Sequence, residues 1–531
     1  MSHAPRSNVR SRHDVIVVGA GPTGLAAACL LAHAGRKVAV FERHASLYNL
    51  PRAGHIDNEI LRVLQGVDCL DEVFEDLFPF IHVPLLGTDG QVLFELTHTH
   101  QSPSSFHGGS LYQPVLEGAL YRQLQRHDAL VTIYQGWTVE GASQNLETVN
   151  VRARPTTADG RATETFECDY LIAADGATSP IREALNIPRE DFGFNERWLD
   201  VDVSYRRACD FGPPAIIGDP SRPHMQIPLG KAHHRFEWHV FPHESYEEFS
   251  SPAKAWQLLN KSGVTADDVA IVRQAVYTFE YRLAERWREG RIFLMGDAAH
   301  TMPPCLGQGM NSGIRDAANL SWKLDLVLRG LAADAILDTY ETERVPHVKA
   351  WSDLSLKAGQ ILCQTDPEKA AARDARFRTG EAPAWRPPPV LTTGLLDIPS
   401  QQAGGVAGQL FPQRTVRRGE RSGRFDDQVG RGFLLVARDD PTAFLAPGDA
   451  AFMKRIGMES VWFSRNDGEA HALVDEAASY ETFFAGHGQA AVIVRPDHYV
   501  FGGVPQLDQL PFLLDKLRIA LATAAAKPSP R

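Results

Sequence analysis

The sequence contains no stretch of about 18 consecutive apolar residues, so it predicts no membrane-spanning helix. Its six cysteines are far apart and none belongs to a C-x-x-C pair, which argues against a disulfide framework and favours a reducing cytoplasm. The first residues, MSHAPRSNVRSRHD, lack the apolar core of a secretory signal. A net charge of -11 offers nucleic acid no basic surface. We therefore expect a cytoplasmic protein with neither a membrane nor a nucleic-acid partner.

The rest of the composition is that of a globular protein. The 531 residues are 44% hydrophobic and 22% charged, and at roughly 100–200 residues per domain they predict two to four domains. Residues 14–42 read DVIVVGAGPTGLAAACLLAHAGRKVAVFE. Two short apolar strands flank an Ala- and Leu-rich helix, which is the pattern of one βαβ unit.

A G-x-G-x-x-G loop, made by Gly19, Gly21 and Gly24, joins the first strand to the helix. In a dinucleotide-binding unit these glycines allow, in turn, a tight turn, the approach of a pyrophosphate and close helix–strand packing. The helix N-terminus attracts the phosphates. Glu42 ends the next strand, where its carboxylate can bind ribose hydroxyls and would repel a 2′-phosphate. The unit predicts FAD or NAD rather than NADP, with a purely structural turn as the alternative.

Two further loops follow predicted strands. Asp175 and Gly176 come after DYLIAA, and Asp297 comes after RIFLMG, where its carboxylate could bind a sugar hydroxyl. A glycine-rich stretch then precedes a long helical region over about 311–363. Its amides could contact the carbonyl edge of a flavin ring, and the helix dipole would stabilise the reduced ring. The residues of this stretch are Gly307, Gln308, Gly309, Met310 and Asn311. Taken singly, each loop could be an ordinary turn.

Taken together, the three loops resemble a known family. G-A-G-P-T-G, A-A-D-G-A-x-S-x-x-R and G-D-A-A-H-x-x-P-P-x-x-G-Q-G-M-N-x-G-x-x-D-A are similar, in order and separation, to the fingerprints of the class A flavoprotein aromatic hydroxylases. Residues 51–65 and 222–244 resemble segments of members that act on 3-(3-hydroxyphenyl)propionate. The resemblance is firm over 14–365 and looser over 401–505.

The resemblance implies an α/β protein with three parts. A Rossmann-like FAD-binding domain is interwoven with an antiparallel-sheet substrate domain, and a C-terminal thioredoxin-like domain follows. Because the last domain lacks C-x-x-C, we expect it to have a structural role. The expected boundaries are a disordered tail over 1–12, FAD-binding segments over 13–80, 105–185 and 281–365, substrate-binding segments over 81–104 and 186–280, a connector over 366–400 and the C-terminal domain over 401–525.

The resemblance also implies the chemistry. FAD, reduced by NADH or NADPH, reacts with molecular oxygen, and the resulting C4a-hydroperoxide hydroxylates a phenol ortho to its hydroxyl group. A second G-x-G-x-x-G after a strand is missing, so the nicotinamide donor should bind transiently. The first choice of substrate is a 3-(3-hydroxyphenyl)propionate-type acid in aromatic catabolism, and resorcinol-type or larger polyhydroxylated aromatics stay open.

Other classes of flavoprotein remain as rivals. A flavin-dependent disulfide reductase or dehydrogenase would require C-x-x-C and a second dinucleotide fold, and the sequence has neither. A flavin-dependent oxidase is a further alternative. A flavin-binding scaffold without activity is the third class. The oligomeric state stays open, with a homodimer as one candidate, and no metal site is expected.

Particular residues acquire expected roles from the resemblance. Pro303 should line the substrate side of the flavin ring, where its carbonyl can meet the aromatic substrate. Arg52 and Gln113 should approach the FAD phosphates or ring; for Arg52 a surface salt bridge is the alternative. Two positions depart from the family pattern: Thr178 stands where an Arg is usual, and His55 where a Gly is usual.

The reaction further requires a group that takes or shares the phenol proton, and a side chain with a pKa near neutrality suits this role. His55 is the candidate, against the alternative of a packing or surface histidine. His300 is interpreted as a structural hydrogen-bonding residue. Arg235 or His234 could pair with a substrate carboxylate, because Arg gives a bidentate match, but a surface position is equally compatible with the sequence.

Overall fold

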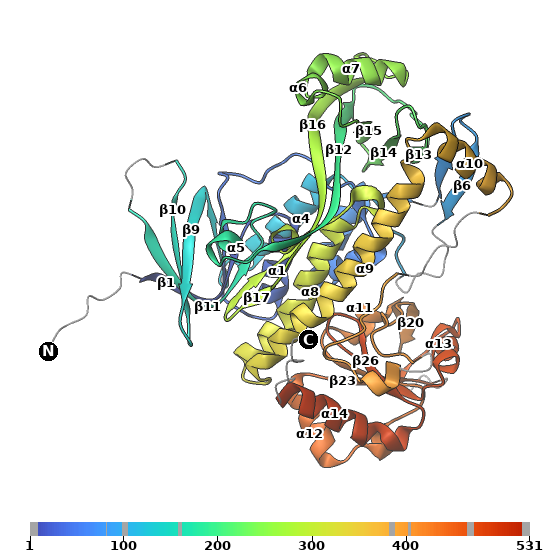
Figure 1. The fold of residues 1–531 in the computed structure, drawn as a ribbon. Coiled ribbons are helices and arrows are strands. Elements are labelled where there is room, and N and C mark those ends of the chain that lie inside the picture. The colour runs from blue at the N-terminus through green and yellow to red at the C-terminus, as the bar shows by residue number, and fades with distance from the viewer. Residues whose placement is uncertain are drawn as a thin grey trace. The chain divides into compact units, whose positions relative to one another are not determined.

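The computed structural model describes residues 9–80, 82–97, 105–157, 162–381, 388–401, 405–464 and 472–522. The protein has a mixed α/β fold (Figure 1). The chain divides into two compact units. The first comprises Met1–His100, His107–Ala317 and Ala350–Pro387, and the second comprises Gln101–Phe106, Ala318–Lys349 and Pro388–Arg531.

The first unit contains a sheet built around parallel strands. Its described strands are β1 (Val9–Val18), β2 (Val38–Glu42), β8 (Val131–Gln135), β9 (Trp137–Gln144), β10 (Val149–Pro155), β11 (Glu164–Ala173), β17 (Arg288–Glu289) and β18 (Ile292–Leu294). Strands β18, β11, β1, β2 and β8 lie side by side in this order and are parallel. Val15, Ile16 and Val17 of β1 are completely buried, as expected for a strand covered on both faces.

Strand β1 begins earlier than expected, so the predicted tail is wrong for residues 9–12. Val9 pairs with Thr165 of β11, and the side chain of Arg12 forms an ion pair with Asp169 at 2.9 Å. The strand extends because β11 continues beyond the core and offers backbone partners to it. The preceding residues of the predicted tail lie outside the described part of the chain.

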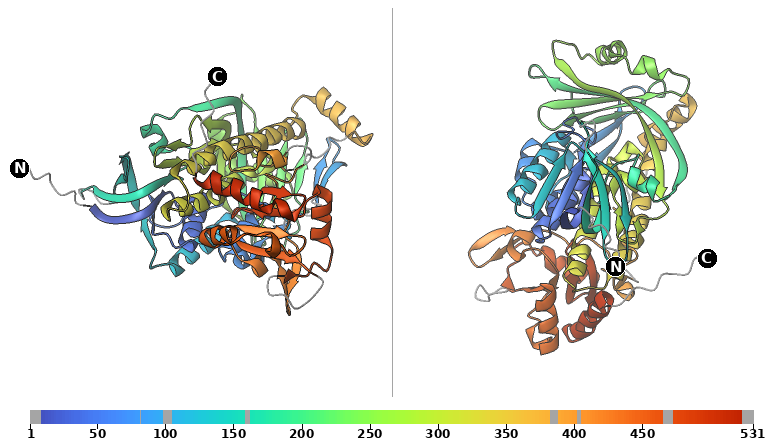
Figure 2. Two further views of the ribbon diagram at one scale, coloured as in Figure 1. Left: turned by 90° about the horizontal axis from the view of Figure 1, so that it is seen from below. Right: turned by 90° about the vertical axis from the view of Figure 1, so that its left-hand side faces the viewer.

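The second sheet of this unit is mainly antiparallel. Its described strands are β5 (His82–Leu86), β6 (Val92–Thr97), β12 (Arg189–Tyr205), β13 (Ala215–Ile217), β14 (His224–Leu229), β15 (His233–Val240), β16 (Val269–Ala284) and β19 (His300–Thr301). Their order is β19-β16-β12-β15-β14-β13-β5-β6. The long strands β12 and β16 run side by side and curve along their length (Figures 1 and 2).

The two faces of the second sheet differ in chemistry because side chains alternate along each strand. Leu199, Val201 and Val203 of β12 belong to an apolar core that includes Phe249 of helix α6 (Tyr246–Phe249) and residues of α7 (Pro252–Lys261). The residues between them, Asp200 and Asp202, therefore face the other side. The sheet thus has one apolar face against helices and one polar face.

The remaining described elements of the first unit surround these sheets. None of the helices formed by the described residues is both long and apolar enough to cross a membrane. A small third sheet joins β3 (His55–Ile56), β7 (Gly109–Ser110) and β4 (Phe78–Pro79). The helices are α1 (Pro22–His33), α2 (Asn58–Gly66), α3 (Leu70–Asp76), α4 (Gln113–Arg126), α5 (Pro180–Ala184), α10 (Pro367–Arg378) and the first part of α8 (Gln308–Leu328) and last part of α9 (Asp338–Leu362).

The expected connector over 366–400 is wrong in its first part, because α10 folds there and packs on the first unit. Asp366 caps the helix by accepting from backbone N–H groups of its first turn. The guanidinium of Arg373 donates to the carbonyl of Gly218 at 2.7 Å, and Phe377 joins an apolar cluster. The charged and proline-rich composition of this segment favoured a connector and did not indicate a capped helix with a buried face.

The second unit contains a five-stranded sheet among its described residues, in the order β24-β23-β22-β25-β26. Strands β24, β23 and β22 are parallel, whereas β25 is antiparallel to both β22 and β26. Its core is rich in aromatic side chains. The elements are β20 (Thr415–Arg418), β21 (Arg421–Arg424), β22 (Leu434–Ala437), β23 (Glu459–Phe463), β24 (Ala472–Leu473), β25 (Ala491–Val494), β26 (Val500–Val504), α11 (Phe425–Val429), α12 (Pro447–Ile456), α13 (Ser479–His487) and α14 (Leu510–Ala522).

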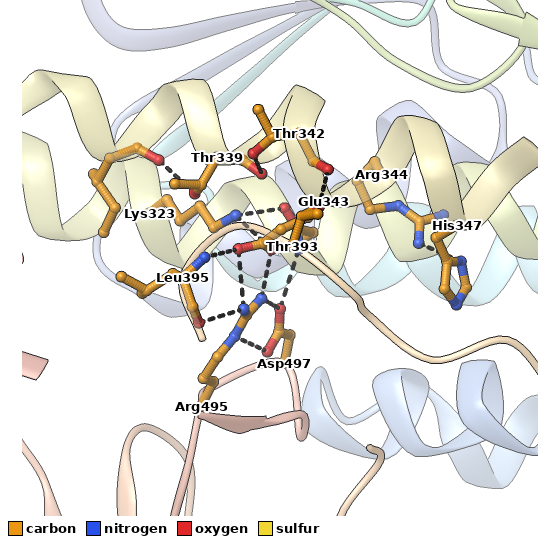
Figure 3. Close-up of polar contacts among 12 residues, drawn as sticks. Lys323, Thr339, Thr342, Glu343, Arg344, His347, Thr393, Leu395, Arg495 and Asp497 are labelled. Atoms are coloured by element: carbon orange, nitrogen blue, oxygen red, sulfur yellow. Dashed lines mark hydrogen bonds and ion pairs between the residues drawn. The ribbon is translucent and has the colours of Figure 1, made fainter. Parts of the chain in front are cut away.

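A buried polar network explains why residues 318–349, which were expected in the FAD-binding domain, cluster with the second unit (Figure 3). Glu343 of α9 lies 2.8 Å from Lys323 of α8 and 2.8 Å from Arg495, which follows β25. Arg495 also pairs with Asp497 at 2.5 Å. Burial alone would raise the pKa of Glu343, but the two cations outweigh it and lower the pKa to about 2.

Candidate active site

The three glycine-containing loops of the sequence converge at the C-terminal ends of the parallel strands β1, β11 and β18. A Cβ atom placed on Gly19 would lie 2.3 Å from the carbonyl oxygen of Ala174, so the first and second loops touch. Similar Cβ atoms on Gly296 and Gly313 would lie 2.9 Å and 2.2 Å from the hydroxyl of Thr23, at the start of α1. The first and third loops are therefore also in contact. Ligands of α/β sheets bind at this edge.

Arg182 joins the second loop to the third. Its buried guanidinium donates to the carbonyls of Ala177 at 3.0 Å and Ala298 at 3.1 Å. This fingerprint residue is therefore occupied inside the protein. The departure from the family pattern at Thr178 leaves the contacts of the nicotinamide donor open. Arg182 is not assigned to those contacts.

The glycines of the loops fall into two groups, which test whether a cofactor fits. Gly19 and Gly24 leave no room for a side chain, because an added Cβ would lie 2.3 Å and 2.0 Å from backbone oxygens. Gly19 also has a φ of +104°, which disfavours other residues. At Gly21, Gly176 and Gly309, in contrast, an added Cβ would meet no protein atom within 4 Å. The open side of the loops thus fits an extended dinucleotide that approaches the backbone closely.

Three carboxylates lie around this edge. The carboxylate of Glu42 accepts from the N–H groups of Ala20 and His44, each at 2.9 Å, and keeps lone pairs for a sugar hydroxyl. Burial raises the pKa of Asp175, whose Oδ1 has no hydrogen-bond partner among the described residues. The side chain of Asp297 is exposed, yet desolvation by the surrounding protein raises the pKa of its carboxyl. These positions are compatible with ribose or ribityl hydroxyls.

The third loop leads into α8, which begins at Gln308, so its first backbone N–H groups have no partner within the helix. Met310 is half-buried in this first turn, and Gly309 faces open space. This arrangement supports the predicted contact between loop amides and the flavin ring.

The side chain of Asn311 fastens the third loop to His55. It donates to the carbonyls of Gly307 at 2.8 Å and His55 at 3.2 Å, and its oxygen accepts from Asp57 N–H at 3.0 Å. Gly307 has a φ of +60°, and an added Cβ would lie 2.7 Å from the Cβ of His55. The missing side chain of Gly307 therefore makes room for His55. From the sequence, we expected the glycines of this loop to make room for the flavin ring. The half-buried imidazole of His55 stacks on Phe80, with ring centres 5.6 Å apart.

His300 is structural, as the sequence suggested. Its completely buried side chain donates from Nε2 to Asp316 at 2.7 Å and stacks on Trp287. The same carboxylate of Asp316 accepts from the N–H of Gly296 at 3.1 Å. The pair fixes the start of the third loop.

Pro303 is buried in the third loop, which packs on helix α9. Its carbonyl accepts from the hydroxyl of Ser355 at 2.8 Å, and the same hydroxyl accepts from the N–H of Leu306 at 3.3 Å. One lone pair of the Pro303 carbonyl is thus used within the protein. Its contact with the substrate stays a prediction.

Arg52 and Gln113 lie together but have different surroundings. The Arg52 side chain is exposed, with its guanidinium 4.2 Å from the centre of the Tyr48 ring. The buried amide of Gln113 accepts from the N–H groups of Arg52 at 3.2 Å and Ala53 at 2.6 Å and donates to Glu117 at 2.7 Å. Gln113 is therefore engaged with the chain itself. Contact of either side chain with FAD stays a prediction.

The geometry argues against the expectation that Arg235 or His234 pairs with a substrate carboxylate. Arg235 is buried and already makes a bidentate pair with Asp202, at 2.6 Å and 2.9 Å. His234 points to the opposite face of β15, where Tyr205 bonds its Nδ1 at 3.1 Å. Burial lowers the pKa of His234 to about 4, so its imidazole is neutral. Adjacent residues of a strand face opposite sides, and the two cannot share one ligand.

Comparison with known proteins agrees with this geometry. Residues 12–355 match the family described as FAD binding domain, and residues 408–520 match the family described as HcaD C-terminal domain. The chain belongs to the FAD-dependent aromatic hydroxylases.

Relatives of this hydroxylase match it over nearly the whole length. A probable NADH-specific resorcinol 4-hydroxylase of Rhodococcus jostii (strain RHA1) is 36% identical, covering 98% of this chain and 97% of the relative. A 3-(3-hydroxy-phenyl)propionate/3-hydroxycinnamic acid hydroxylase of Klebsiella pneumoniae (strain 342) is 33% identical, covering 97% of each.

Solved structures show the same fold. A flavin-dependent monooxygenase PieE, solved with FAD and substrate, has a TM-score of 0.79 at 22% identity, covering 97% of this chain and 99% of the other. Aklavinone-11 hydroxylase, solved with FAD and aklavinone, has a TM-score of 0.76 at 26% identity, covering 96% and 99%.

Several residues beside the candidate site were not foreseen from the sequence. Asp202 and Arg273, which lie opposite each other on the polar face of the second sheet, and Phe80, which stacks on His55, belong to no motif. The alternation in WLDVDVSY, with acids at every second position of an apolar strand, was the available signal. It indicates that one face of the strand is polar, although it does not say what lies opposite.

Proposed function

We propose that this protein is an FAD-dependent, NAD(P)H-consuming monooxygenase that inserts one oxygen atom into a phenol, ortho to its hydroxyl group. The observation that carries the proposal is the convergence of three loops whose outward glycines Gly21, Gly176 and Gly309 leave the backbone open to a flat, extended cofactor. Membership of the FAD-dependent aromatic hydroxylases supports the reaction class.

The first unit would hold FAD in a Rossmann-like domain. Gly21 and the N-terminus of α1 would bind the pyrophosphate, and Glu42 a ribose. Asp175, Gly176 and Asp297 would contact the middle of the molecule, and the amides of the first turn of α8 the flavin edge. When bound, FAD supplies electron transfer from the nicotinamide donor and the activation of oxygen.

On the substrate side, His55 would hold or accept the phenol proton, because its imidazole is half-buried and fixed by Phe80 and by Asn311 of the third loop. Pro303 would line the same space. The apolar side chains of Phe80, Ile227 and Leu229 form a cluster beside His55 that would exclude water.

We infer a FAD-binding domain around the parallel sheet and a substrate domain around the second sheet. The mixed sheet of the second unit, flanked by helices α12, α13 and α14, supports a thioredoxin-like domain. Its lack of C-x-x-C supports a structural role.

Three substrate classes remain under this function: a 3-(3-hydroxyphenyl)propionate-type acid, a resorcinol-type phenol and a larger polyhydroxylated aromatic. Arg235, the residue that would have bound a carboxylate, is paired with Asp202, and this favours the classes without a carboxylate. The name of the Rhodococcus jostii relative supports NADH as the reductant. The homodimer stays a prediction.

The decisive test is incubation of the holoenzyme with NADH or NADPH and each phenol under ¹⁸O-labelled oxygen gas. We expect one labelled atom in a catechol-type product, detected by mass spectrometry, and faster turnover of resorcinol than of the propionate. Formation of hydrogen peroxide alone, with every phenol of a broad panel, would exclude the proposed function.

FAD is expected to be bound without a covalent bond. Backbone amides and carboxylates at the three loops can hold FAD by non-covalent contacts, and the sequence suggests no clear His or Cys attachment site. The purified protein should be yellow, and acid precipitation should release all of the flavin into the supernatant, measured by its absorbance. Yellow colour retained in the washed pellet would contradict this prediction.

A further inference from the structure

The backbone of Pro51–Gly54, here called the PRAG loop, is held from two sides. On the side of the second sheet, Arg235 Nη1 donates to the carbonyl of Arg52 at 2.7 Å, and Arg273 donates to the carbonyl of Pro51. On the other side, Gln113 accepts from the N–H groups of Arg52 and Ala53. Side chains from other elements therefore bind both carbonyls and N–H groups of this loop.

The PRAG loop also lies tightly against the sheet. A Cβ atom on Gly54 would lie 2.9 Å from a methyl carbon of Ile227 and 2.9 Å from one of Leu229. The carbonyl of Gly54 accepts from the N–H of Leu111 at 3.2 Å. The loop therefore has little freedom to move while these contacts persist.

Arg235 is itself held in one orientation. Asp202 lies directly opposite it in the β12–β15 register and binds its guanidinium through both oxygens. Asp200 and Glu237 lie farther away, at 3.9 Å and 3.6 Å. The fork geometry of Arg allows one side chain to bind a carboxylate and a backbone carbonyl at once, which a lysine cannot reproduce.

Two side chains of the proposed chemistry depend on this loop. Arg52, within it, extends its exposed guanidinium over Tyr48, and His55 follows it directly and stacks on Phe80. A shift of the loop backbone would displace both. Displacements of about 1 Å can cost two orders of magnitude in rate.

We propose that Arg235, oriented by Asp202, is a positioning residue that couples hydroxylation to NADH oxidation by holding the PRAG loop in place. The inference rests on the proposed function and deepens it at the same site. In the coupled reaction, NADH, a proton, oxygen and the phenol give NAD⁺, water and the hydroxylated product. In the uncoupled reaction, NADH, a proton and oxygen give NAD⁺ and hydrogen peroxide. A displaced loop favours the second reaction, because the phenol and His55 no longer meet and water enters.

The test compares Arg235→Lys and Asp202→Asn with the wild-type holoenzyme. For both variants we expect the ratio of hydrogen peroxide to NADH consumed to rise severalfold. The kcat for product formation should fall by roughly tenfold or more, while the KM for NADH changes less than about twofold. FAD content and the flavin absorbance spectrum are measured in parallel.

Arg222→Met is the matched control. Arg222 also makes a bidentate pair, with Glu244 at 2.9 Å and 2.5 Å, and donates to a backbone carbonyl, that of His239, at 2.7 Å. It does not touch the PRAG loop, so its loss should leave coupling at the wild-type value.

Gln113→Met extends the test from the other side of the loop, in case the Arg235 variant does not fold, and should also uncouple the reaction. Wild-type coupling in the folded variants, or equal uncoupling in Arg222→Met, would overturn the inference. Wild-type enzyme that forms no hydroxylated product with any phenol would instead remove the proposed function first, and the two failures are distinguishable because the wild type is measured alone.

Discussion

Gly309→Val is expected to abolish NADH-dependent hydroxylation while the fold stays intact. A Cβ at this position meets no protein atom within 4 Å, so a branched side chain would extend into the space proposed for the flavin ring. Gly309 is the second residue of α8, and valine is no worse than glycine in a helix, so the helix itself should tolerate it. Product formation should fall by about a hundredfold or more, by analogy with small misplacements in active sites.

The matched control for this substitution is Gly448→Val. Gly448 is the second residue of α12, and an added Cβ there also meets no atom within 4 Å. This variant should keep wild-type FAD content, activity and melting temperature. Normal turnover and FAD content in Gly309→Val would show that the third loop does not face the flavin.

Glu343→Gln is expected to destabilise the second unit strongly. The substitution leaves the buried cations of Lys323 and Arg495 with one fewer carboxylate (Figure 3), and breaking a buried ion pair costs about 3–5 kcal/mol. Amide hydrogen exchange in β25 and in the first half of α9 should accelerate accordingly. Local exchange is the suitable measurement because a protein with two units need not unfold in one step.

The control for this prediction is Glu476→Gln, which removes a surface partner of Arg417 at 3.1 Å, where the glutamate side chain is 66% exposed. Surface pairs contribute about 0–1 kcal/mol, so exchange should hardly change. Equal exchange in the two variants would contradict the structural role of the network.

The same network predicts a dependence on acid. Because the pKa of Glu343 is lowered to about 2 in the folded protein, its contribution to stability is present above its unfolded pKa and is lost as pH falls toward about 2. Glu343→Gln should therefore lose most of its stability difference from the wild type in acid.

The features that could be predicted from the sequence are local patterns, because neighbouring residues determine them. The strand–loop–helix unit with Gly19, Gly21 and Gly24 was predictable because turn geometry and apolar runs act over a few residues. The structural role of His300 was also inferred correctly. The helix α10 was missed because its burial depends on distant residues such as Gly218.

The role of a residue could not be predicted from the sequence where it depends on a tertiary contact with a distant part of the chain. Arg235 was interpreted as a substrate contact from its residue type, and Gln113 as a FAD contact from the resemblance; the contacts with the PRAG loop that both side chains make were not foreseen. The missing side chain of Gly307 was expected to make room for the flavin ring, yet it makes room for His55, about 250 residues earlier in the chain; the contact of the Gly307 backbone with the flavin stays a prediction.

By itself, the sequence of this protein determined the βαβ unit and the three glycine loops, and the resemblance of their combination to a known family indicated the class of cofactor. These features follow from short-range backbone sterics and from residue types that a nucleotide requires. Only the tertiary structure decided which glycines face open space, which arginine is already paired and which histidine is fixed beside the third loop. Such contacts join residues far apart in the chain, and their geometry is set by packing, which residue type and spacing do not encode locally.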